Sequence, residues 1–342
     1  MEKFDVILVG GGPAGLQCAK VLAGSDLRVL LLEKQDGFGD KLCAGGLTLK
    51  DMDVLPLPDH VIERKISRAA IHSRRRRADT VVSVPYLFTV DRKELGAYQR
   101  SLLDGTPVVV RTNSQVTEIG ADKVLLKDGR AFGFRYLVGA DGHASMVRRH
   151  LGLKVRKKLI GFQYTIPVKD VDPVLEIFLD ARKFNVWYAW IFPHRESIAV
   201  GCCCDPERVN HLKVRARFLD WLAEKGIDPG DARLESYPIA CDYRGVRFGN
   251  IFLVGEAAGL ASGFTGEGIY QSLVSGQEVA RMILDPGYEP DLLHQAIKYN
   301  RTLERVMNIF RFSGPLKGFL QEFLVFLMTR KRLRDKINAE FS

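Results

Sequence analysis

The first 33 residues contain the pattern that most constrains the fold. An apolar run from Phe4 to Val9 is short enough to be a buried parallel strand. Three glycines in G-x-G-x-x-G spacing follow it, and they are Gly10, Gly12 and Gly15. Helical periodicity comes next, and a second apolar run ends at Glu33. This order of strand, glycine turn, helix and strand predicts a βαβ unit that binds a dinucleotide.

Each residue of this fingerprint has an expected task. The first glycine makes the turn, the second lets backbone approach a pyrophosphate, and the third lets helix and strand pack closely. The helix that contains Ala14 would point its N-terminus at the phosphates. Glu33 can accept the adenosine ribose hydroxyls, and we include the adjacent Lys34 in the predicted site. A carboxylate at this position disfavours a 2′-phosphate but does not separate NAD from FAD.

Two later segments do separate them. Residues 134–152 combine an apolar strand with Asp141-Gly142, and residues 249–259 combine another strand with Gly255-Glu256. These segments resemble the FAD-binding motifs of the para-hydroxybenzoate hydroxylase-type flavoproteins. The resemblance implies that Asp141 lies near FAD and that Glu256 takes the place of an Asp that holds the ribityl chain. It also implies that Arg92, in the stretch VDRKEL, approaches the cofactor; a solvated helix residue is the alternative.

The glycine-rich stretch VGEAAGLASGFTGEGIYQ, residues 254–271, follows Glu256 into a predicted helix. The stretch includes Gly266 and Gly268, whose small size would let backbone pass beside a flavin ring. A helix from about Gly268 would direct its N-terminal dipole at the ring and favour the anionic reduced flavin. The alternative is a glycine turn that serves tight packing.

Two segments are similar to the geranylgeranyl reductase family: YAWIFP, residues 188–193, and KLCAGGL, residues 41–47, in which Ala44 separates the cysteine from the glycine pair. The resemblance implies active-site roles for Cys43, Tyr188 and Trp190. On a strand, Tyr188 and Trp190 share one face and could line a tunnel for an apolar chain. The alternatives are a sheet face packed on the core and, for Cys43, a small buried hydrophobe.

The fold class expected from these motifs is α/β. A Rossmann-like FAD-binding domain would comprise residues 1–55, 90–150 and 240–290. An inserted antiparallel β-sheet domain for the substrate would comprise 56–89 and 151–239, and residues 291–342 would form C-terminal helices. Four consecutive arginines, Arg74 to Arg77, lie between two strand-like runs. They predict a solvated turn, or else a site for a diphosphate or a lipid headgroup.

The formal net charge of +9 favours anionic partners, but no motif for nucleic acid accompanies it. The six cysteines include three in a row and no CxxC pair, so we expect no disulfide framework, no metal site and a reducing, cytoplasmic location. Cys202, Cys203 and Cys204 are interpreted as packing residues. The segment 312–341 combines Phe and Leu with a basic end, which predicts either peripheral contact with an anionic membrane or packing between domains.

The sequence therefore predicts an FAD-dependent reductase that saturates double bonds of a long isoprenoid or lipid chain. No second G-x-G-x-x-G is present, so the electrons would come from a transient donor, either NAD(P)H or a small electron carrier. One alternative is an aromatic monooxygenase of the same superfamily. Another is a lipid carrier that keeps FAD only as structure.

Overall fold

The computed structural model describes residues 1–330, and the chain divides into two compact units. The first unit consists of Met1–Lys41, Arg92–Lys158 and Ile239–Arg301, and the intervening stretches with the C-terminal part form the second. Two differences from the domain ranges expected from the sequence stand out. Residues 42–55 belong to the second unit because their strand pairs with a strand of that unit. The helices after residue 290 form no separate part, because the boundary between the two units falls after Arg301.

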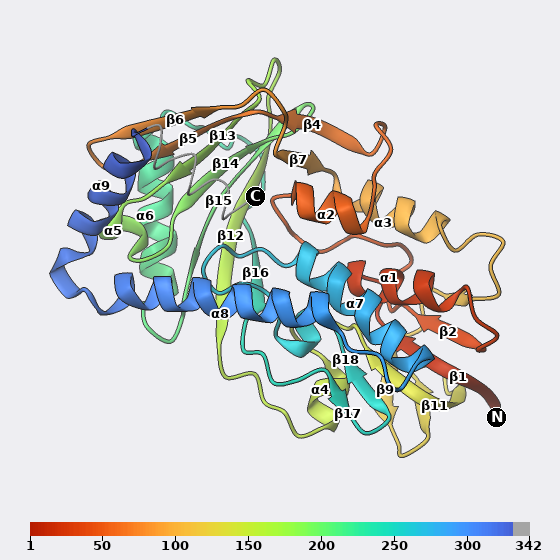
Figure 1. Cartoon of the computed structure of the whole chain (residues 1–342). Helices are drawn as coiled ribbons and strands as arrows, with labels where there is room; N and C mark the ends of the chain where they lie inside the picture. The colour runs from red at the N-terminus through yellow and green to blue at the C-terminus, as the bar shows by residue number, and fades with distance from the viewer. Residues whose placement is uncertain (331–342) are drawn as a thin grey trace. The chain divides into compact units, whose positions relative to one another are not determined.

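A mostly parallel sheet forms the first unit (Figure 1). Its strands run in the order β17-β18-β11-β1-β2-β8, and the hairpin of β9 and β10 joins β11. The strands are β1 (Glu2–Val9), β2 (Val29–Leu32), β8 (Val109–Arg111), β9 (Val116–Ile119), β10 (Lys123–Leu126), β11 (Ala131–Gly139), β17 (Arg247–Phe248) and β18 (Ile251–Leu253). β1 pairs in parallel with both β11 and β2, and Val6, Ile7 and Leu8 of β1 are fully buried. The predicted buried parallel strand is confirmed.

The helices of this unit follow the strand ends. They are α1 (Pro13–Leu22), α3 (Arg92–Ser101), α4 (Met146–His150), the 3-10 turn η1 (Gly255–Ala258) and α7 (Ile269–Leu284). α1 packs closely on α7, because Gly276 of α7 faces the carbonyl oxygen of Ala14 with no side chain between them. A Cβ on Gly276 would lie 2.2 Å from that oxygen. The close packing of α1 on α7 therefore requires glycine at position 276.

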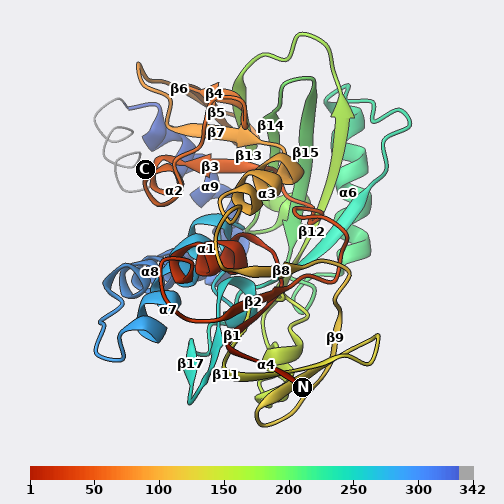
Figure 2. The same cartoon turned by 90° about the vertical axis from the view of Figure 1, so that its right-hand side faces the viewer.

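The second unit has two sheets (Figure 2). The larger has the order β16-β12-β15-β14-β13-β5-β6, and the smaller has the order β3-β7-β4. The strands are β3 (Gly46–Thr48), β4 (Ile62–Ile66), β5 (Arg68–His72), β6 (Arg77–Val81), β7 (Leu87–Val90), β12 (Lys158–Pro167), β13 (Val174–Phe178), β14 (Ala189–Pro193), β15 (Ser197–Cys204) and β16 (Glu235–Ala240). The predicted antiparallel sheet is confirmed, except that β5 and β13 are parallel. These two strands come from different insertions, so no hairpin fixes their direction.

Helix α6 (His211–Glu224) covers one face of the larger sheet. Its Val214, Phe218 and Trp221 pack on a cluster that includes Cys202 and Cys204, and Cys203 is also buried. All three are buried and form no disulfide within the described residues, so their interpretation as packing residues is confirmed. The remaining helices of this unit are α2 (Leu49–Val54), α5 (Ala181–Phe184), η2 (Gly314–Leu316) and α9 (Lys317–Met328).

α8 (Asp291–Phe312) begins in the first unit and ends in the second. The fold class predicted from the sequence, including helices after residue 290, is confirmed over the described residues. The basic end of the predicted tail, residues 331–342, lies outside them. Within residues 1–330, no helix combines the length and apolar character that crossing a membrane requires.

The close packing of α1 on α7 can be tested with Gly276→Val. The new side chain would clash with backbone rather than with a movable side chain, so we expect a loss of about 1–3 kcal/mol in the free energy of unfolding. Urea denaturation followed by circular dichroism measures it. Gly37→Ala is the control, because a Cβ there meets nothing within 4 Å. Equal stability of Gly276→Val and wild type would contradict the packing argument.

Candidate active site

The turn between β1 and α1 has the geometry that anion binding requires. Gly10 has φ +107°, and a Cβ there would lie 2.4 Å from the carbonyl oxygen of Ala140. A Cβ on Gly15 would lie 2.0 Å from the carbonyl oxygen of Gly10, so the third glycine allows the helix to pack on the turn. A Cβ on Gly12, by contrast, would point into open space. The second glycine therefore leaves room beside the backbone.

The N-terminus of α1 is open to an anion. Its N-cap residue, Gly12, offers no side-chain acceptor, and the first turn contains no acidic residue. Pro13 begins the helix and the small Ala14 follows, so no long side chain fills the first turn. The N–H groups and positive dipole end of such a helix attract a phosphate.

Glu33 lies directly after β2 and holds the glycine turn. One of its carboxylate oxygens accepts a hydrogen bond of 2.6 Å from the N–H of Gly11, and the other accepts one of 2.9 Å from the N–H of Gln35. Each carboxylate oxygen has a second lone pair. Glu33 can therefore support the turn and still accept the ribose hydroxyls expected from the sequence.

Three of the residues expected to bind the cofactor carry a buried polar atom that has no hydrogen-bond partner among the described residues. These atoms are Nε of Arg92, Oδ1 of Asp141 and Oε2 of Glu256. The other carboxylate oxygen of Asp141 caps α4 by accepting from the N–H of Met146 at 2.6 Å. Burial raises the pKa of Asp141 against these opposing hydrogen bonds. Buried polar groups without partners are rare in folded proteins, and here three residues predicted to bind one cofactor have them.

Glu256 lies in η1 and is only 8% exposed. Its Oε1 forms an ion pair with Nζ of Lys41, a residue that our sequence reasoning missed. Lys41 is the first residue of the stretch KLCAGGL. Its position shortly before Cys43 is the sequence feature that could have indicated a role in the site. The ion pair uses one oxygen and leaves Oε2 for a ligand. The Glu that replaces the expected Asp is thus anchored by a cation.

Two more basic groups act on this carboxylate region. Burial lowers the pKa of His143, the charges of Lys41 and Lys34 lower it further, and the charge of Glu256 opposes the shift. One buried carboxylate, Glu256, and two lysines, Lys41 and Lys34, thus all act on His143. The cofactor-binding role expected for Lys34 stays a prediction.

Arg148 is a second residue to which the sequence analysis assigned no role. Its side chain is 1% exposed and forms an ion pair of 2.9 Å with Asp242. It also donates hydrogen bonds to the carbonyl oxygens of Ala257 in η1 and Leu153 after α4. Arg148 therefore fixes the segment that follows Asp141 to the turn that carries Glu256.

The glycine-rich stretch leads into α7 as predicted. Gly255 has φ +56° and donates its N–H to Oγ of Ser275 at 2.8 Å. Gly266 has φ +72°, and a Cβ there would meet nothing within 4 Å. Gly268 is the N-cap of α7, with no side-chain cap and no acidic residue in the first turn. This second uncapped helix N-terminus is available to an electron-rich group.

These observations fit FAD. Two uncapped helix ends, a carboxylate after β2, an unpartnered guanidinium nitrogen and two unpartnered carboxylate oxygens match the pyrophosphate, ribose and ribityl groups in chemistry. No group of three or more potential metal ligands occurs within residues 1–330.

In the second unit, the Cys43 segment is held on the larger sheet. Nε2 of Gln163 donates to the carbonyl oxygen of Cys43 at 3.3 Å, and the thiol of Cys43 accepts from the N–H of Gly45 at 3.4 Å. A Cβ on Gly45 would lie 2.3 Å from the carbonyl oxygen of Val90, and one on Gly46 would lie 2.5 Å from the ring of Phe192. The two glycines let the segment lie against its neighbours.

A histidine and a glutamate complete this attachment, and the sequence reasoning singled out neither. His194 directly follows YAWIFP; its Nε2 lies 3.1 Å from the carbonyl oxygen of Ala44, and its Nδ1 lies 2.5 Å from Oε2 of Glu63. The imidazole thus lies between the carbonyl oxygen of Ala44 and the carboxylate of Glu63. Burial opposes the shift, but the hydrogen bond and charge of His194 lower the pKa of Glu63. The motif YAWIFP is thereby joined to the Cys43 segment.

Trp190 lies on the sheet face opposite α6. In the strand register, Gln163, Gly201 and Trp190 form one row across β12, β15 and β14. The indole covers Gly201, where a Cβ would lie 2.4 Å from the ring, and its buried Nε1 has no partner within the described chain. Tyr188 lies just outside β14 and contacts Trp190 edge to face at 6.1 Å between ring centroids. The structure thus brings Trp190, Tyr188 and the segment of Cys43 to one face.

The fold and the cofactor-binding motifs together define an FAD-dependent oxidoreductase. The chain belongs to the family described as FAD binding domain, whose profile matches residues 3–281. Within this class, the chain is similar to geranylgeranyl reductases, the family that its motifs predicted.

Three relatives illustrate the similarity. The geranylgeranyl diphosphate reductase of Rhodobacter capsulatus is 28% identical over 311 residues, which cover 85% of this chain and 78% of the relative. A solved geranylgeranyl bacteriochlorophyll reductase-like protein of Thermoplasma acidophilum has a TM-score of 0.79 at 21% identity, with 96% and 92% of the chains covered. PqsL of Pseudomonas aeruginosa, a probable FAD-dependent monooxygenase, has a TM-score of 0.71 at 18% identity, with 95% and 100% covered. The two solved structures show the shared fold alone.

The contribution of Glu256 can be measured with Glu256→Ala. Loss of a hydrogen bond to a charged acceptor costs about 1.5–3 kcal/mol, so the dissociation constant of FAD should rise about ten- to a hundred-fold. Titration of the apoprotein with FAD, followed by flavin fluorescence, gives the constant. Glu118→Ala, an exposed glutamate of β9 in the same unit, is the matched control. Unchanged affinity in Glu256→Ala would remove Glu256 from the site.

The attachment of the Cys43 segment can be tested with His194→Ala. Loss of its two contacts should free the segment and raise the rate of Cys43 alkylation by iodoacetamide about ten-fold at pH 7, measured by peptide mass spectrometry. The other five cysteines are buried and serve as internal references. His211→Ala, an exposed histidine of α6, is the control. An unchanged rate would show that His194 does not hold the segment.

The same contact predicts a pH dependence of stability. Because the folded-state pKa of Glu63 lies below its ordinary value of 4.5, its contribution is present above pH 4.5 and is lost as pH falls through the depressed value. Glu63→Gln should therefore unfold at lower urea concentration than wild type at pH 7, and the difference should shrink below pH 4.5. A difference that stays constant with pH would contradict the ion pair.

Proposed function

We propose that the protein reduces carbon–carbon double bonds of an isoprenoid chain of the geranylgeranyl type. The observation that carries this proposal is the similarity to a geranylgeranyl diphosphate reductase along most of both chains. The geometry of the second unit supports it, since an aromatic sheet face and a cysteine segment lie together there. The first unit would hold FAD through Gly10, Gly12, Gly15, Glu33, Arg92, Asp141 and Glu256. The second unit would hold the substrate.

When bound in its reduced form, FAD would supply the hydride for one alkene carbon. The chain's own residues would do the rest. Trp190, Tyr188 and Phe192 would hold the apolar chain and exclude water from it. The thiol of Cys43 would orient the alkene or supply the proton for the second carbon. An isolated alkene accepts hydride poorly, so the reaction depends on fixed positioning by these residues.

The electron donor would be transient, because the sequence contains only one dinucleotide fingerprint. NAD(P)H or a small electron carrier would reduce the flavin and leave. The headgroup of the substrate stays open, since the similar proteins are named for a diphosphate and for bacteriochlorophyll. We propose a cytoplasmic location, as predicted from the cysteines.

An anaerobic experiment tests the function. Purified protein with bound flavin is reduced chemically, geranylgeranyl diphosphate is added, and the flavin spectrum and the lipid mass are followed. Return of the oxidised spectrum together with a gain of two hydrogens per event is the expected result. No change until air is admitted, with oxygen then appearing in an added aromatic substrate, would favour the monooxygenase. A flavin that responds to no reductant and no lipid would favour the lipid carrier.

Trp190→Ala tests the role of the aromatic face. Removal of the indole should lower the rate of flavin reoxidation by the lipid at least about ten-fold, because the alkene loses its fixed position. Stopped-flow absorbance measures the rate, and the flavin content should equal that of wild type. Trp190→Phe keeps an aromatic ring and should recover much of the rate. Full activity in Trp190→Ala would remove Trp190 from the substrate site.

A further inference from the structure

The outward face of α9 is apolar where a surface helix is ordinarily polar. The inward face packs through Val325 and Met328 on Ala78 of β6. On the outward side, Phe319 and Phe323 are 65% and 47% exposed, and their rings stack at 6.3 Å between centroids. Both sides of α9 therefore have the character of buried surface, and only one side is covered by the described chain.

The exposed apolar surface extends back along the chain. Phe312 at the end of α8 is 75% exposed, and Leu316 in η2 is 60% exposed. Together with Phe319 and Phe323 they form what we call the α9 apolar face. Single exposed apolar residues are ordinary, but four large ones within twelve residues mark an interaction site.

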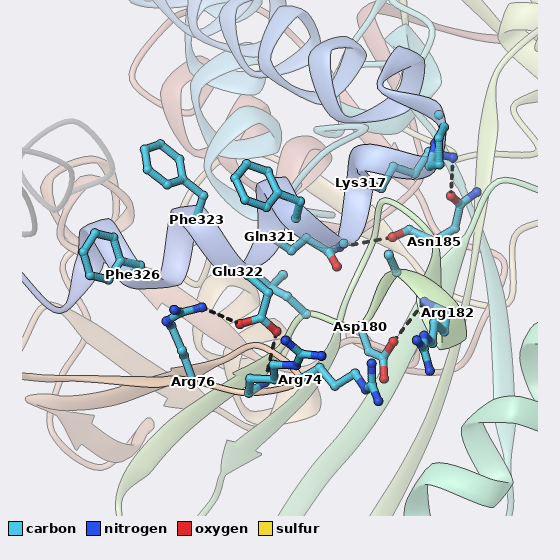
Figure 3. A pocket seen from close by; sticks show the side chains of 17 residues that line it. Arg74, Arg76, Asp180, Arg182, Asn185, Lys317, Gln321, Glu322, Phe323 and Phe326 are labelled. Carbon is cyan, nitrogen blue, oxygen red and sulfur yellow. Dashed lines mark hydrogen bonds and ion pairs between the residues drawn. The ribbon is translucent and has the colours of Figure 1, made fainter.

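A basic hollow of about 790 Å³ adjoins this face (Figure 3). It is formed by α9, α5 and the turn between β5 and β6. Five basic side chains line it, namely Arg74, Arg75, Arg76, Arg182 and Lys317, against two carboxylates, Asp180 and Glu322. The hollow therefore carries an excess of three positive charges and faces solvent beside exposed aromatic rings.

The contacts within the hollow leave part of this charge for a partner. Glu322 is held by Arg76 at 3.1 Å and by the N–H of Arg75 at 3.0 Å, and Lys317 donates to Oδ1 of Asn185 at 2.8 Å. The guanidinium groups of Arg74 and Arg75 form no ion pair within residues 1–330. The arginine run expected from the sequence thus forms a turn, and α9 packs beside it.

We propose that the α9 apolar face and the β5–β6 arginine turn dock this protein on an anionic lipid bilayer. Phe319 and Phe323 enter the boundary between headgroups and acyl chains, and Arg74 and Arg75 contact the lipid phosphates. Charge complementarity selects this occupant over a second copy of the chain. A twofold interface would bring two surfaces of the same positive sign together. The proposal rests on this surface alone and holds whatever reaction the flavin supports.

Vesicle sedimentation with the full chain tests the proposal. One vesicle type contains phosphatidylcholine alone, and the other contains phosphatidylcholine with phosphatidylglycerol. We expect binding to the anionic vesicles, weakened by added salt, and little binding to the neutral ones. Arg74→Gln/Arg75→Gln should lower the partition coefficient about 25-fold, at about five-fold per charge. Phe319→Ser/Phe323→Ser should lower it at least about ten-fold, because the apolar contact is lost.

Matched controls separate the surface from general effects. Lys123→Gln/Lys127→Gln removes the same charge from residues that do not line the hollow, and Leu212→Ser removes an exposed apolar residue of α6. Both should bind as wild type does, and every variant should retain its flavin spectrum and melting temperature. Absence of wild-type binding would overturn the proposal, and so would equal loss in the controls. It would also be overturned if Phe319→Ser/Phe323→Ser turned a dimer into a monomer in light scattering without vesicles.

Discussion

The candidate cofactor site depends most on the contacts made by the buried guanidinium group of Arg148. It joins Asp242, the carbonyl oxygen of Ala257 and the backbone after α4, so two motifs separated by about a hundred residues are fixed to each other. A buried arginine is stable only when its donors are all used, and removal of one partner leaves an uncompensated charge. The placement of Asp141 and Glu256 in the first unit therefore depends on a residue that need not contact the cofactor.

Glycines shape the candidate binding regions of both units, but they serve a different purpose in each. In the first, glycines remove side chains so that helix ends and backbone N–H groups remain open to an anionic ligand. In the second, glycines let the Cys43 segment lie against the sheet, and side chains then hold its carbonyl groups through Gln163 and His194. Backbone carbonyls in a loop need such partners, because an unpaired buried carbonyl costs free energy. In the second unit, glycines thus make room for the Cys43 segment, and polar side chains hold it in place.

The α9 apolar face differs from the sites above: it consists of exposed apolar side chains, whereas those sites consist of buried polar groups. Burial of apolar area stabilises a protein by about 25 cal/mol for each Å² removed from water. The outward phenylalanines of α9 contribute this stabilisation only when a partner covers them. The adjacent arginine turn indicates that this partner is negatively charged, since a positive surface attracts an anionic one.

The sequence by itself determined the features that local backbone geometry encodes. The glycine fingerprint, the buried strand before it, the turn at the arginine run and the helix after Gly268 follow from residue types at short spacing. Only the tertiary structure decided the pairs that distant segments form: Lys41 with Glu256, His194 with Ala44, and β5 parallel to β13. The physical reason is that a pattern of a few residues fixes φ and ψ and the buried face. A contact between residues more than a hundred positions apart depends on how the whole chain closes.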